Sequence, residues 1–445
     1  MERKSNQYIK VGISVVDISP KKGIELCGYA ARSGGNTGIL DNVYVKTIAI
    51  DDGNKKAALI SCDLLGLDFE IISSIKNKAK KELGLDTKAL MIASIHTHSG
   101  PVTIHNNGIG LKDDDYIKFL KEKLWESIST AFTSMEPADA YYYQGTCDIG
   151  INRRGRIEEG SIEPSADPNG IIDRQVSVIA FYRLENNGPF SVFFNFGCHP
   201  VVLEPENNLV SADFPGAACS FIEKSFNGRV KAIFTNGSAG NINPILRGSE
   251  NEVKINGEKL GSAVMDILKT KGSKLDPFLS YDVIEVILPY AQPIMKEEFQ
   301  KTLAEYNEQR KKTKPGSVEE KLAEANINWA NKYLDEISNG KIPDYLQIYL
   351  YGLRIGNLSL IGIPAEVFAQ TSIWIKEHVS DKVLVLGYTN GNIGYLPSSD
   401  EISQGGYEVS EAHKYYNRPN HYSGDAEENV RFASLKLFES IQTDS

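Results

Sequence analysis

The chain has no apolar run long enough to cross a membrane and no tract dominated by lysine and arginine. Its formal net charge is −10 and its pI is about 5.4. Because nucleic-acid binding requires a basic surface, we expect no nucleic-acid partner. The most basic runs, residues 76–81 and 310–314, have helical character and fit solvated helix faces.

Cysteine is scarce, and the number of cysteines is odd. They are widely spread and mostly lie within apolar runs, which favours reduced, buried thiols over a disulfide framework. Residues 1–7 are charged at the start and reach no apolar core of signal-peptide length. We therefore predict a cytoplasmic location without a transmembrane segment, and leave the oligomeric state open. The cysteines are Cys27, Cys62, Cys147, Cys198 and Cys219.

What the chain does have is an ordinary globular composition, with 445 residues, 41% hydrophobic and 24% charged. Short apolar runs at 46–50 and 57–61 are followed by a helical pattern at 71–83, an alternation typical of α/β proteins. We expect a mixed β-sheet core flanked by helices, with a final helix near 427–441. Further strands are predicted at 176–182, 190–196, 232–234, 281–288, 346–354, 358–363 and 383–386.

Two segments differ from this alternation. Residues 295–340 are rich in Glu, Lys and Ala and are interrupted by Pro315-Gly316, which predicts a helical hairpin. Because strands resume afterwards, we interpret it as an insertion within a single domain spanning 1–445. Residues 153–173 are rich in Gly, Pro, Asp and Glu and predict a long loop, which we expect to cover a cleft.

The apolar run at 89–93 leads into two closely spaced histidines, His96 and His98. Alternate residues of a strand face the same side, so both imidazoles are expected to point into one cleft. Gly100 and Pro101 then turn the chain away. Two neighbouring imidazoles indicate either a metal site or a proton relay.

Polar residues also follow three later strands. The first is His199, which precedes Pro200, the second is Glu366, and the third is Tyr395, which comes after a Gly-rich turn. In open α/β sheets, ligands bind at the carboxyl ends of strands, where residues far apart in sequence converge. Histidines with a glutamate suit zinc with an open water position, where the pKa of the water falls to about 7.

Each of these residues also has a simpler interpretation. His199 fits a partner of a backbone carbonyl, Glu366 fits a helix cap, and Tyr395 fits a half-buried aromatic. Asp213 and Asp63 are further candidates that either orient a ligand imidazole or cap a helix and hold a loop.

Taken together, these segments resemble the catalytic domain of the neutral ceramidase family, the zinc-dependent, neutral/alkaline, non-lysosomal amidases that cleave the N-acyl bond of ceramide. The signature His-Thr-His-Ser-Gly-Pro is the most specific element of the resemblance, which extends over most of the chain. The matching motifs lie at residues 11–18, 28–30, 37–39, 95–101, 151–153 and 404–408.

The resemblance implies that His96, His199, Glu366 and Tyr395 are zinc ligands. It selects His96 over His98 because the family uses the first histidine, a choice that the spacing alone leaves open.

The resemblance also implies a mechanism in which a zinc-activated water attacks an amide carbonyl. Zinc, Arg153 and the Tyr395 hydroxyl would stabilise the oxyanion, and His98 would pass a proton to the leaving amine.

The chain departs from the family pattern in ways that bear on the substrate. Asn243 stands where ceramidases have a serine in the cleft. The chain ends soon after residues 404–408, where ceramidases continue into a C-terminal β-sandwich, so we expect no such domain. The expected substrate is a lipid or a smaller, more polar N-acyl compound. Alternatives are a zinc hydrolase of an ester, lactone or carbohydrate, and a non-catalytic metal-binding protein of the same fold.

Overall fold

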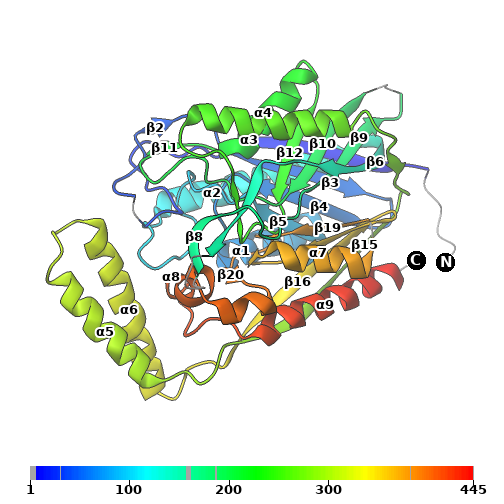
Figure 1. Cartoon of the computed structure of the whole chain (residues 1–445). Helices are drawn as coiled ribbons and strands as arrows, with labels where there is room; N and C mark the ends of the chain where they lie inside the picture. The colour runs from blue at the N-terminus through cyan, green and yellow to red at the C-terminus, as the bar shows by residue number, and fades with distance from the viewer. Residues whose placement is uncertain (1–6, 31, 157–161, 186–187, 381, 444–445) are drawn as a thin grey trace.

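Two β-sheets packed face to face form the centre of the structure (Figure 1). It is a computed structural model that describes residues 7–30, 32–156, 162–185, 188–380 and 382–443. The predicted absence of a signal peptide concerns residues 1–7 and so falls almost wholly outside this range. Within it, no helix combines the length and apolar character that a membrane crossing requires.

The larger sheet has the strand order β12-β10-β9-β6-β1-β3-β4-β5, with β14 paired to β6. Its neighbours are antiparallel except for the parallel pairs β10–β12 and β4–β5. The strands are β1 (Ile9–Asp17), β3 (Tyr44–Asp51), β4 (Lys56–Cys62), β5 (Leu90–Ser94), β6 (Glu136–Thr146), β9 (Gln175–Arg183), β10 (Pro189–Phe196), β12 (Lys231–Asn236) and β14 (Ser273–Lys274).

The smaller sheet has the order β15-β16-β17-β19, in which only β17 and β19 are parallel. Its strands are β15 (Leu279–Pro289), β16 (Tyr345–Ile355), β17 (Leu358–Gly362) and β19 (Val383–Leu386). Each strand predicted for the two sheets has a counterpart here, because buried strands require the apolar runs seen in the sequence. Short ladders elsewhere involve β2 (Gly38–Ile39), β11 (Leu209–Val210), β18 (Glu366–Val367) and β20 (Tyr395–Leu396).

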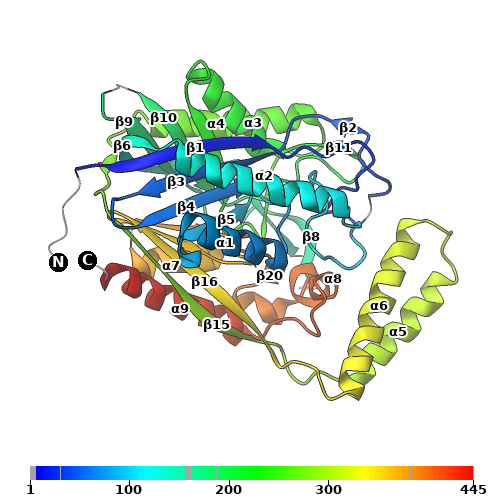
Figure 2. The ribbon, with the colours of Figure 1, turned by 180° about the vertical axis from the view of Figure 1, so that it is seen from behind.

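Helices cover the outer faces of the two sheets (Figures 1 and 2). Four pack on the larger sheet through one apolar cluster, and two pack on the smaller sheet through another. The mixed α/β fold with flanking helices is thus confirmed. The first four are α1 (Phe69–Leu83), α2 (Asp114–Thr133), α3 (Asp213–Ser225) and α4 (Glu250–Ile267), and the other two are α7 (Ala369–Val379) and α9 (Gly424–Thr443).

The predicted helical hairpin lies where the sequence placed it. It consists of α5 (Lys296–Arg310) and α6 (Val318–Ser338), which leave the end of β15 and return at the start of β16. Both views show it projecting from the body beside the short helix α8 (Ala412–Tyr415). An aromatic cluster that includes Phe299 and Trp329 holds its two helices together.

The prediction of a long loop at residues 153–173 is wrong. Strands β7 (Gly150–Arg156) and β8 (Ile162–Asp167) form an antiparallel hairpin there, and β13 (Ile242–Pro244) pairs with the other edge of β7. Most side chains of β8 face solvent, so the strand has none of the apolar alternation by which half-buried strands are recognised. The tip, residues 157–161, lies outside the described range.

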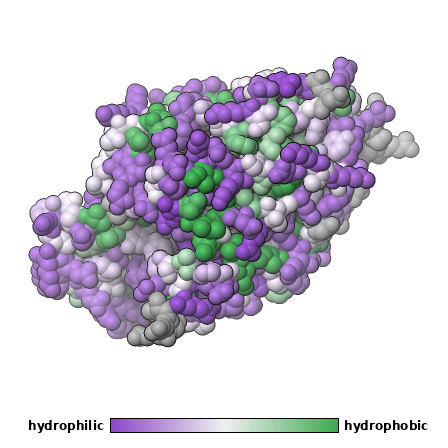
Figure 3. All heavy atoms as spheres, turned by 45° about the horizontal axis from the view of Figure 1, so that its top comes forward, coloured by the Kyte–Doolittle hydropathy of each residue, from purple (hydrophilic) through white to green (hydrophobic). Residues whose placement is uncertain are grey.

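The surface is mostly polar, with patches of apolar side chains on the face drawn in Figure 3. Among the exposed large apolar residues are Leu111, which is 76% exposed, and Ile245, which is 53% exposed. Scattered apolar side chains are normal on soluble proteins, and only large contiguous patches indicate contact with lipid or protein.

Helix α1 contains a lysine whose charged group is buried. Lys76 is 6% exposed, its Nζ lies 3.6 Å from the ring centroid of Tyr351 on β16, and it has no hydrogen-bond partner among the described residues. Burial lowers the pKa of its ammonium group to about 7, although Asp86 acts in the opposite direction. The unfolded chain, with an ordinary lysine pKa, therefore binds more protons between about pH 7 and 10.

We expect the Lys76→Met variant to raise the free energy of unfolding at pH 7 by about 1–2 kcal/mol, because it removes the cost of burying an amine. Stability of the wild type should rise between pH 7 and 9.5, and the variant should lose much of that rise. Denaturant titrations at both pH values measure this, with the exposed Lys80→Met as the control in the same helix. An unchanged pH slope would contradict the prediction.

Candidate metal centre

The segments that follow strands of both sheets meet at one place. The turn after β19 joins them, because the Ser94 amide donates to the Tyr388 carbonyl at 3.1 Å and the Asn390 amide donates to the Ile92 carbonyl at 2.7 Å. The Gly387 amide donates to the carbonyl of Asn236 at the end of β12, at 3.2 Å. The carboxyl ends of the strands thus converge as expected from the sequence.

The two histidines after β5 also meet, but for a different reason from the one predicted. β5 ends at Ser94, and His96 adopts a positive φ of 72°, so strand alternation does not apply to His96 and His98. Their Nε2 atoms nevertheless lie 3.4 Å apart. A left-handed backbone at a residue other than glycine is strained, and such strain often accompanies functional sites.

The His96 ring is held from two sides. Its Nδ1 lies 2.7 Å from the carbonyl oxygen of Leu65, and the ring stacks on Tyr388 with centroids 4.1 Å apart. A carbonyl can only accept, so Nδ1 carries a proton, and Nε2 is the nitrogen left to face another partner. That Nε2 lies 3.1 Å from Oε2 of Glu366.

His199 repeats this arrangement. Its Nδ1 lies 2.5 Å from the carbonyl oxygen of Ala239, and its Nε2 lies 3.2 Å from the same Oε2 of Glu366. Burial and the nearby Arg153 lower the pKa of His199 to about 3, although Glu366 acts to raise it. The simple interpretation, a partner of a backbone carbonyl, is correct for Nδ1 and leaves Nε2 available.

Glu366 does not cap a helix, because α7 begins only at Ala369. It lies in β18, directly opposite Tyr395 of β20 in a parallel ladder. Burial would raise the pKa of its carboxyl group, but His96 and His199 hold that pKa well below the ordinary value. The hydroxyl of Tyr416 donates a hydrogen bond to Oε1, the oxygen that faces away from the histidines.

These three side chains fit a metal ion. His96, His199 and Glu366 are 1%, 0% and 0% exposed, and two nitrogens converge on one carboxylate oxygen at 3.1 and 3.2 Å. Ligand atoms about 2.0–2.2 Å from a tetrahedral zinc lie roughly 3.3–3.6 Å from one another. Two neutral imidazoles with a carboxylate form a borderline donor set that suits zinc.

His98 belongs to the same cluster, since ligand atoms of His96, His98 and His199 all lie within 4.8 Å of one another. It differs from the other two in its Nδ1, which is buried without a hydrogen-bond partner among the described residues. Burial, together with the neighbouring His96 and His199, lowers its pKa well below the ordinary value. No carbonyl among the described residues holds its Nδ1, whereas carbonyls hold Nδ1 of the other two.

Arg153 and Asn243 lie beside the histidines. The Arg153 guanidinium donates from Nε to Oε1 of Glu408 at 2.9 Å and from Nη1 to Oδ1 of Asn243 at 3.4 Å. Its Nη2 is buried and has no partner in the described structure. The guanidinium carbon lies 5.2 Å from the ring centroid of Tyr395, and that ring stacks with His199 at 6.3 Å. Burial raises the pKa of Tyr395 well above its ordinary value, against the effect of Arg153.

Asp213 and Asp63 are not the partners of the His96 and His199 Nδ1 atoms, because these atoms contact the carbonyls of Leu65 and Ala239. Asp213 starts α3 and accepts from the Leu203 amide at 3.1 Å, so it holds the loop after His199. Asp63 accepts from the Tyr44 amide at 2.9 Å. These contacts fit the simpler interpretation of the two residues, in which they hold a loop or a helix start.

Sequence reasoning missed two tyrosines and a glutamate, namely Tyr388 under His96, Tyr416 on Glu366, and Glu408 on Arg153. Glu408 stands in a motif that the sequence singled out, at residues 404–408, and Tyr388 lies between the predicted strand at 383–386 and Tyr395. Tyr416 follows a second tyrosine in a polar stretch, and no local pattern marks it.

Comparison with known proteins gives three related findings. A sequence model of the family described as neutral/alkaline non-lysosomal ceramidase, N-terminal, matches residues 9–302. Neutral ceramidase 2 of Arabidopsis thaliana is 24% identical over 239 residues, which make up 50% of this chain and 31% of that protein. Neutral ceramidase of Pseudomonas aeruginosa is 22% identical over 251 residues, 53% of this chain and 37% of that protein. The matched stretch spans about a third of these relatives.

The fold is also shared. The crystal structure of neutral ceramidase from Pseudomonas aeruginosa superposes with a TM-score of 0.75 at 16% identity, covering 99% of this chain and 75% of that one. A structure titled as ceramidase complexed with C2 superposes with the same TM-score at 17% identity, covering 99% and 76%.

Proposed function

Since the chain belongs to the neutral/alkaline non-lysosomal ceramidase family, we propose that it is a zinc-dependent hydrolase that cleaves the N-acyl amide bond of a lipid or a smaller polar substrate. One observation carries the proposal: Nε2 of His96 and Nε2 of His199 converge on Oε2 of a fully buried Glu366. The type of bond cleaved, an amide, is inferred from the family.

In this proposal His96, His199, Glu366 and Tyr395 hold the metal. When bound, zinc supplies Lewis-acid chemistry that polarises a carbonyl and lowers the pKa of water. The carbonyl partners of the two Nδ1 atoms fix the tautomer that a ligand needs, and this favours His96 over His98 as the ligand.

Arg153 binds the substrate carbonyl and stabilises the negative charge that develops on its oxygen. Its Nη2 is a buried donor without a partner in the described residues, while Glu408 and Asn243 hold the rest of the guanidinium in place. A donor fixed in this way needs little reorganisation during the reaction.

His98 takes a proton from the attacking water and passes it to the leaving amine. It lies beside His96 and is more exposed than the proposed ligands, and its lowered pKa favours the neutral form, which can accept this proton. Its carbonyl accepts from Nη1 of Arg32 at 2.6 Å, which anchors the backbone at this position.

The test is a substrate panel assayed with zinc-loaded protein. Short and long N-acyl amides, including ceramide, are compared with matched esters, a lactone and glycosides, and released amine, carboxylate and sugar are measured. We expect amine and carboxylate in equal amounts, activity lost on chelation and restored by zinc, and no activity in His199→Ala. Cleavage of esters, lactones or glycosides without amides would overturn the amide assignment, and zinc binding without turnover of any substrate would overturn catalysis.

The hydrogen bond from Tyr416 to Glu366 leads to a separate prediction. The Tyr416→Phe variant should bind zinc about tenfold more weakly, because residues that orient metal ligands typically contribute at least that much. Competition with a chromophoric chelator measures the affinity without reference to activity. The neighbouring Tyr415→Phe is the control and should bind zinc normally. Equal affinities in both variants would contradict a role for Tyr416.

A further inference from the structure

Tyr388 has a strained backbone although it is a bulky residue. It lies in the turn after β19 with a φ of 52°, and the ring on which it stacks belongs to His96, a second residue with a positive φ, 72°. Residues other than glycine rarely adopt this conformation, and such strain is concentrated at functional sites. The fold thus maintains an unfavourable backbone at both members of the stacked pair.

The segments that carry two of the proposed ligands hold the backbone of Tyr388. Its amide donates to the carbonyl of Ala365, the residue before Glu366, at 3.1 Å. Its carbonyl accepts from the amide of Ser94, two residues before His96, also at 3.1 Å. With the ring centroids of Tyr388 and His96 4.1 Å apart, the tyrosine is fixed against the candidate metal centre.

The hydroxyl of Tyr388 has no hydrogen-bond partner among the described residues, although the side chain is only 1% exposed. A buried hydroxyl without a partner is costly and uncommon in proteins. Burial raises its pKa well above the ordinary value, and Glu366 and Tyr395 act in the same direction while Arg153 acts against them. The hydroxyl therefore lies within electrostatic reach of the metal centre, and it is protonated and free to donate.

A second buried donor at this centre, Nη2 of Arg153, also lacks a partner in the described part of the chain. The Glu366 carboxylate is engaged elsewhere, because Oε1 accepts from Tyr416 and Oε2 faces the two histidines. We propose that the Tyr388 hydroxyl, beside Nη2 of Arg153, donates a hydrogen bond to an oxygen of a small anion at the metal centre, such as the carboxylate that amide cleavage releases. This inference rests on the proposed function and adds Tyr388 to the residues that contact the acyl group.

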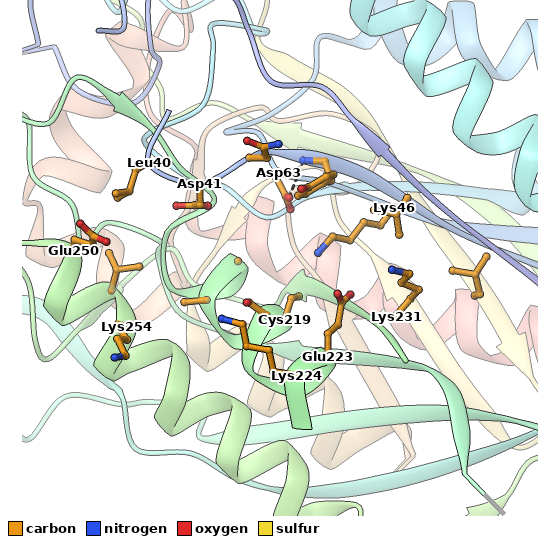
Figure 4. A pocket seen from close by; sticks show the side chains of 18 residues that line it. Leu40, Asp41, Lys46, Asp63, Cys219, Glu223, Lys224, Lys231, Glu250 and Lys254 are labelled. Carbon is orange, nitrogen blue, oxygen red and sulfur yellow. Dashed lines mark hydrogen bonds between the residues drawn. The ribbon is translucent and has the colours of Figure 1, made fainter. Parts of the chain in front are cut away.

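The cavity drawn in Figure 4 is a competing place for an anion and provides a contrast. It encloses about 750 Å³ between β1, β3, α3 and α4. Its lining has as many acids as lysines, and Nζ of its buried Lys46 donates to the carbonyl of Ala232 at 3.3 Å. Among the described residues, none that lines it has a buried polar side-chain atom without a partner. We therefore expect no selection of an anion there.

The test is calorimetric titration of the zinc-loaded protein with acetate and, separately, with ethanethiol. A carboxylate accepts strong hydrogen bonds, whereas sulfur is a weak acceptor. We expect Tyr388→Phe to bind acetate on the order of tenfold more weakly, because a hydrogen bond to a charged group is lost. It should bind ethanethiol and zinc as the wild type does, since the ring remains on His96.

Two matched controls and one further variant accompany the test. Tyr422→Phe removes another buried hydroxyl without a partner in the described structure, on a ring that stacks with Tyr290, and should bind acetate normally. Lys224→Met, in the lining of the cavity of Figure 4, should also bind acetate normally. Tyr388→Leu lacks the ring as well as the hydroxyl and should weaken both acetate and zinc binding by about tenfold.

Denaturant titration of the metal-free protein gives a second readout. Because no described group pairs with the hydroxyl, Tyr388→Phe should have the same denaturation midpoint as the wild type or a higher one. A lower midpoint, an unchanged acetate affinity, or an equal loss of acetate and ethanethiol affinity in Tyr388→Phe would overturn the proposal. The expected acetate pattern without cleavage of any amide would support it and overturn only the amide assignment, whereas a wild type that binds no zinc would overturn both.

Discussion

The Glu366→Gln variant is expected to lose its zinc and at least about a thousandfold in kcat/KM, which corresponds to about 4 kcal/mol of transition-state stabilisation. The substitution preserves the shape of the side chain, so packing should survive. It removes the negative charge that faces Nε2 of His96 at 3.1 Å and Nε2 of His199 at 3.2 Å. An amide in this orientation supplies either a neutral oxygen or an N–H group that opposes metal binding.

Metal analysis after dialysis against zinc, followed by kinetics on the amide found in the substrate panel, measures both effects. Glu377→Gln on the exposed face of α7 is the control and should keep zinc and activity. A Glu366→Gln protein with stoichiometric zinc and full activity would contradict the proposed centre. Loss of activity with zinc retained would show instead that Glu366 acts on the substrate.

The Arg154→Met variant is expected to lower the free energy of unfolding by about 3–5 kcal/mol, the usual cost of leaving buried charges without their partner. Arg154 is 2% exposed, and its guanidinium donates to Glu401 at 3.0 Å, to Glu408 at 2.8 Å and to the Gly405 carbonyl at 2.8 Å. Without it, two nearly buried carboxylates lose the cation that they share, while Glu408 keeps Arg153 and Glu401 keeps the Gln370 amide.

Denaturant titration measures the loss, with the exposed Arg156→Met on the same strand as the control. Arg153→Met offers a sharper comparison, because Glu408 keeps its bond to Arg154 in that variant. It should lose less than half as much stability, while it should lose activity by about a hundredfold as an oxyanion donor. A loss of under 1 kcal/mol for Arg154→Met would contradict a structural role for this ion pair network.

The strands and helices were largely predictable because their causes are local. Apolar runs such as residues 190–196 and 358–363 correspond to β10 and β17, and the helical pattern at 71–83 corresponds to α1. The wrong prediction at residues 153–173 also follows from this dependence on local pattern. Most of β8 is exposed to solvent, so its sequence has no apolar alternation. Apolar patterns in a sequence report burial, so a strand that faces solvent leaves no such pattern.

The candidate site was predicted in its residue types and only partly in its geometry. Strand alternation was the wrong reason for bringing His96 and His98 together, because His96 lies beyond the strand with a positive φ. Tyr416 was missed because its partner Glu366 lies 50 residues earlier, and no local pattern links the two. Arg153 and Arg154 are adjacent and of the same type, so no local pattern predicted that they have different partners.

By itself, the sequence determined the α/β class, the positions of most strands along the chain and the presence of histidines and a glutamate after strand ends, since these depend on residue type and near neighbours. Only the tertiary structure decided which atoms meet. It gives His96 and His199 a carbonyl on Nδ1 and leaves His98 without one, and it places Arg153 at the candidate metal centre and Arg154 in a buried ion pair. The physical reason is that such contacts join segments up to about 300 residues apart, and their distances follow from packing rather than from spacing along the chain.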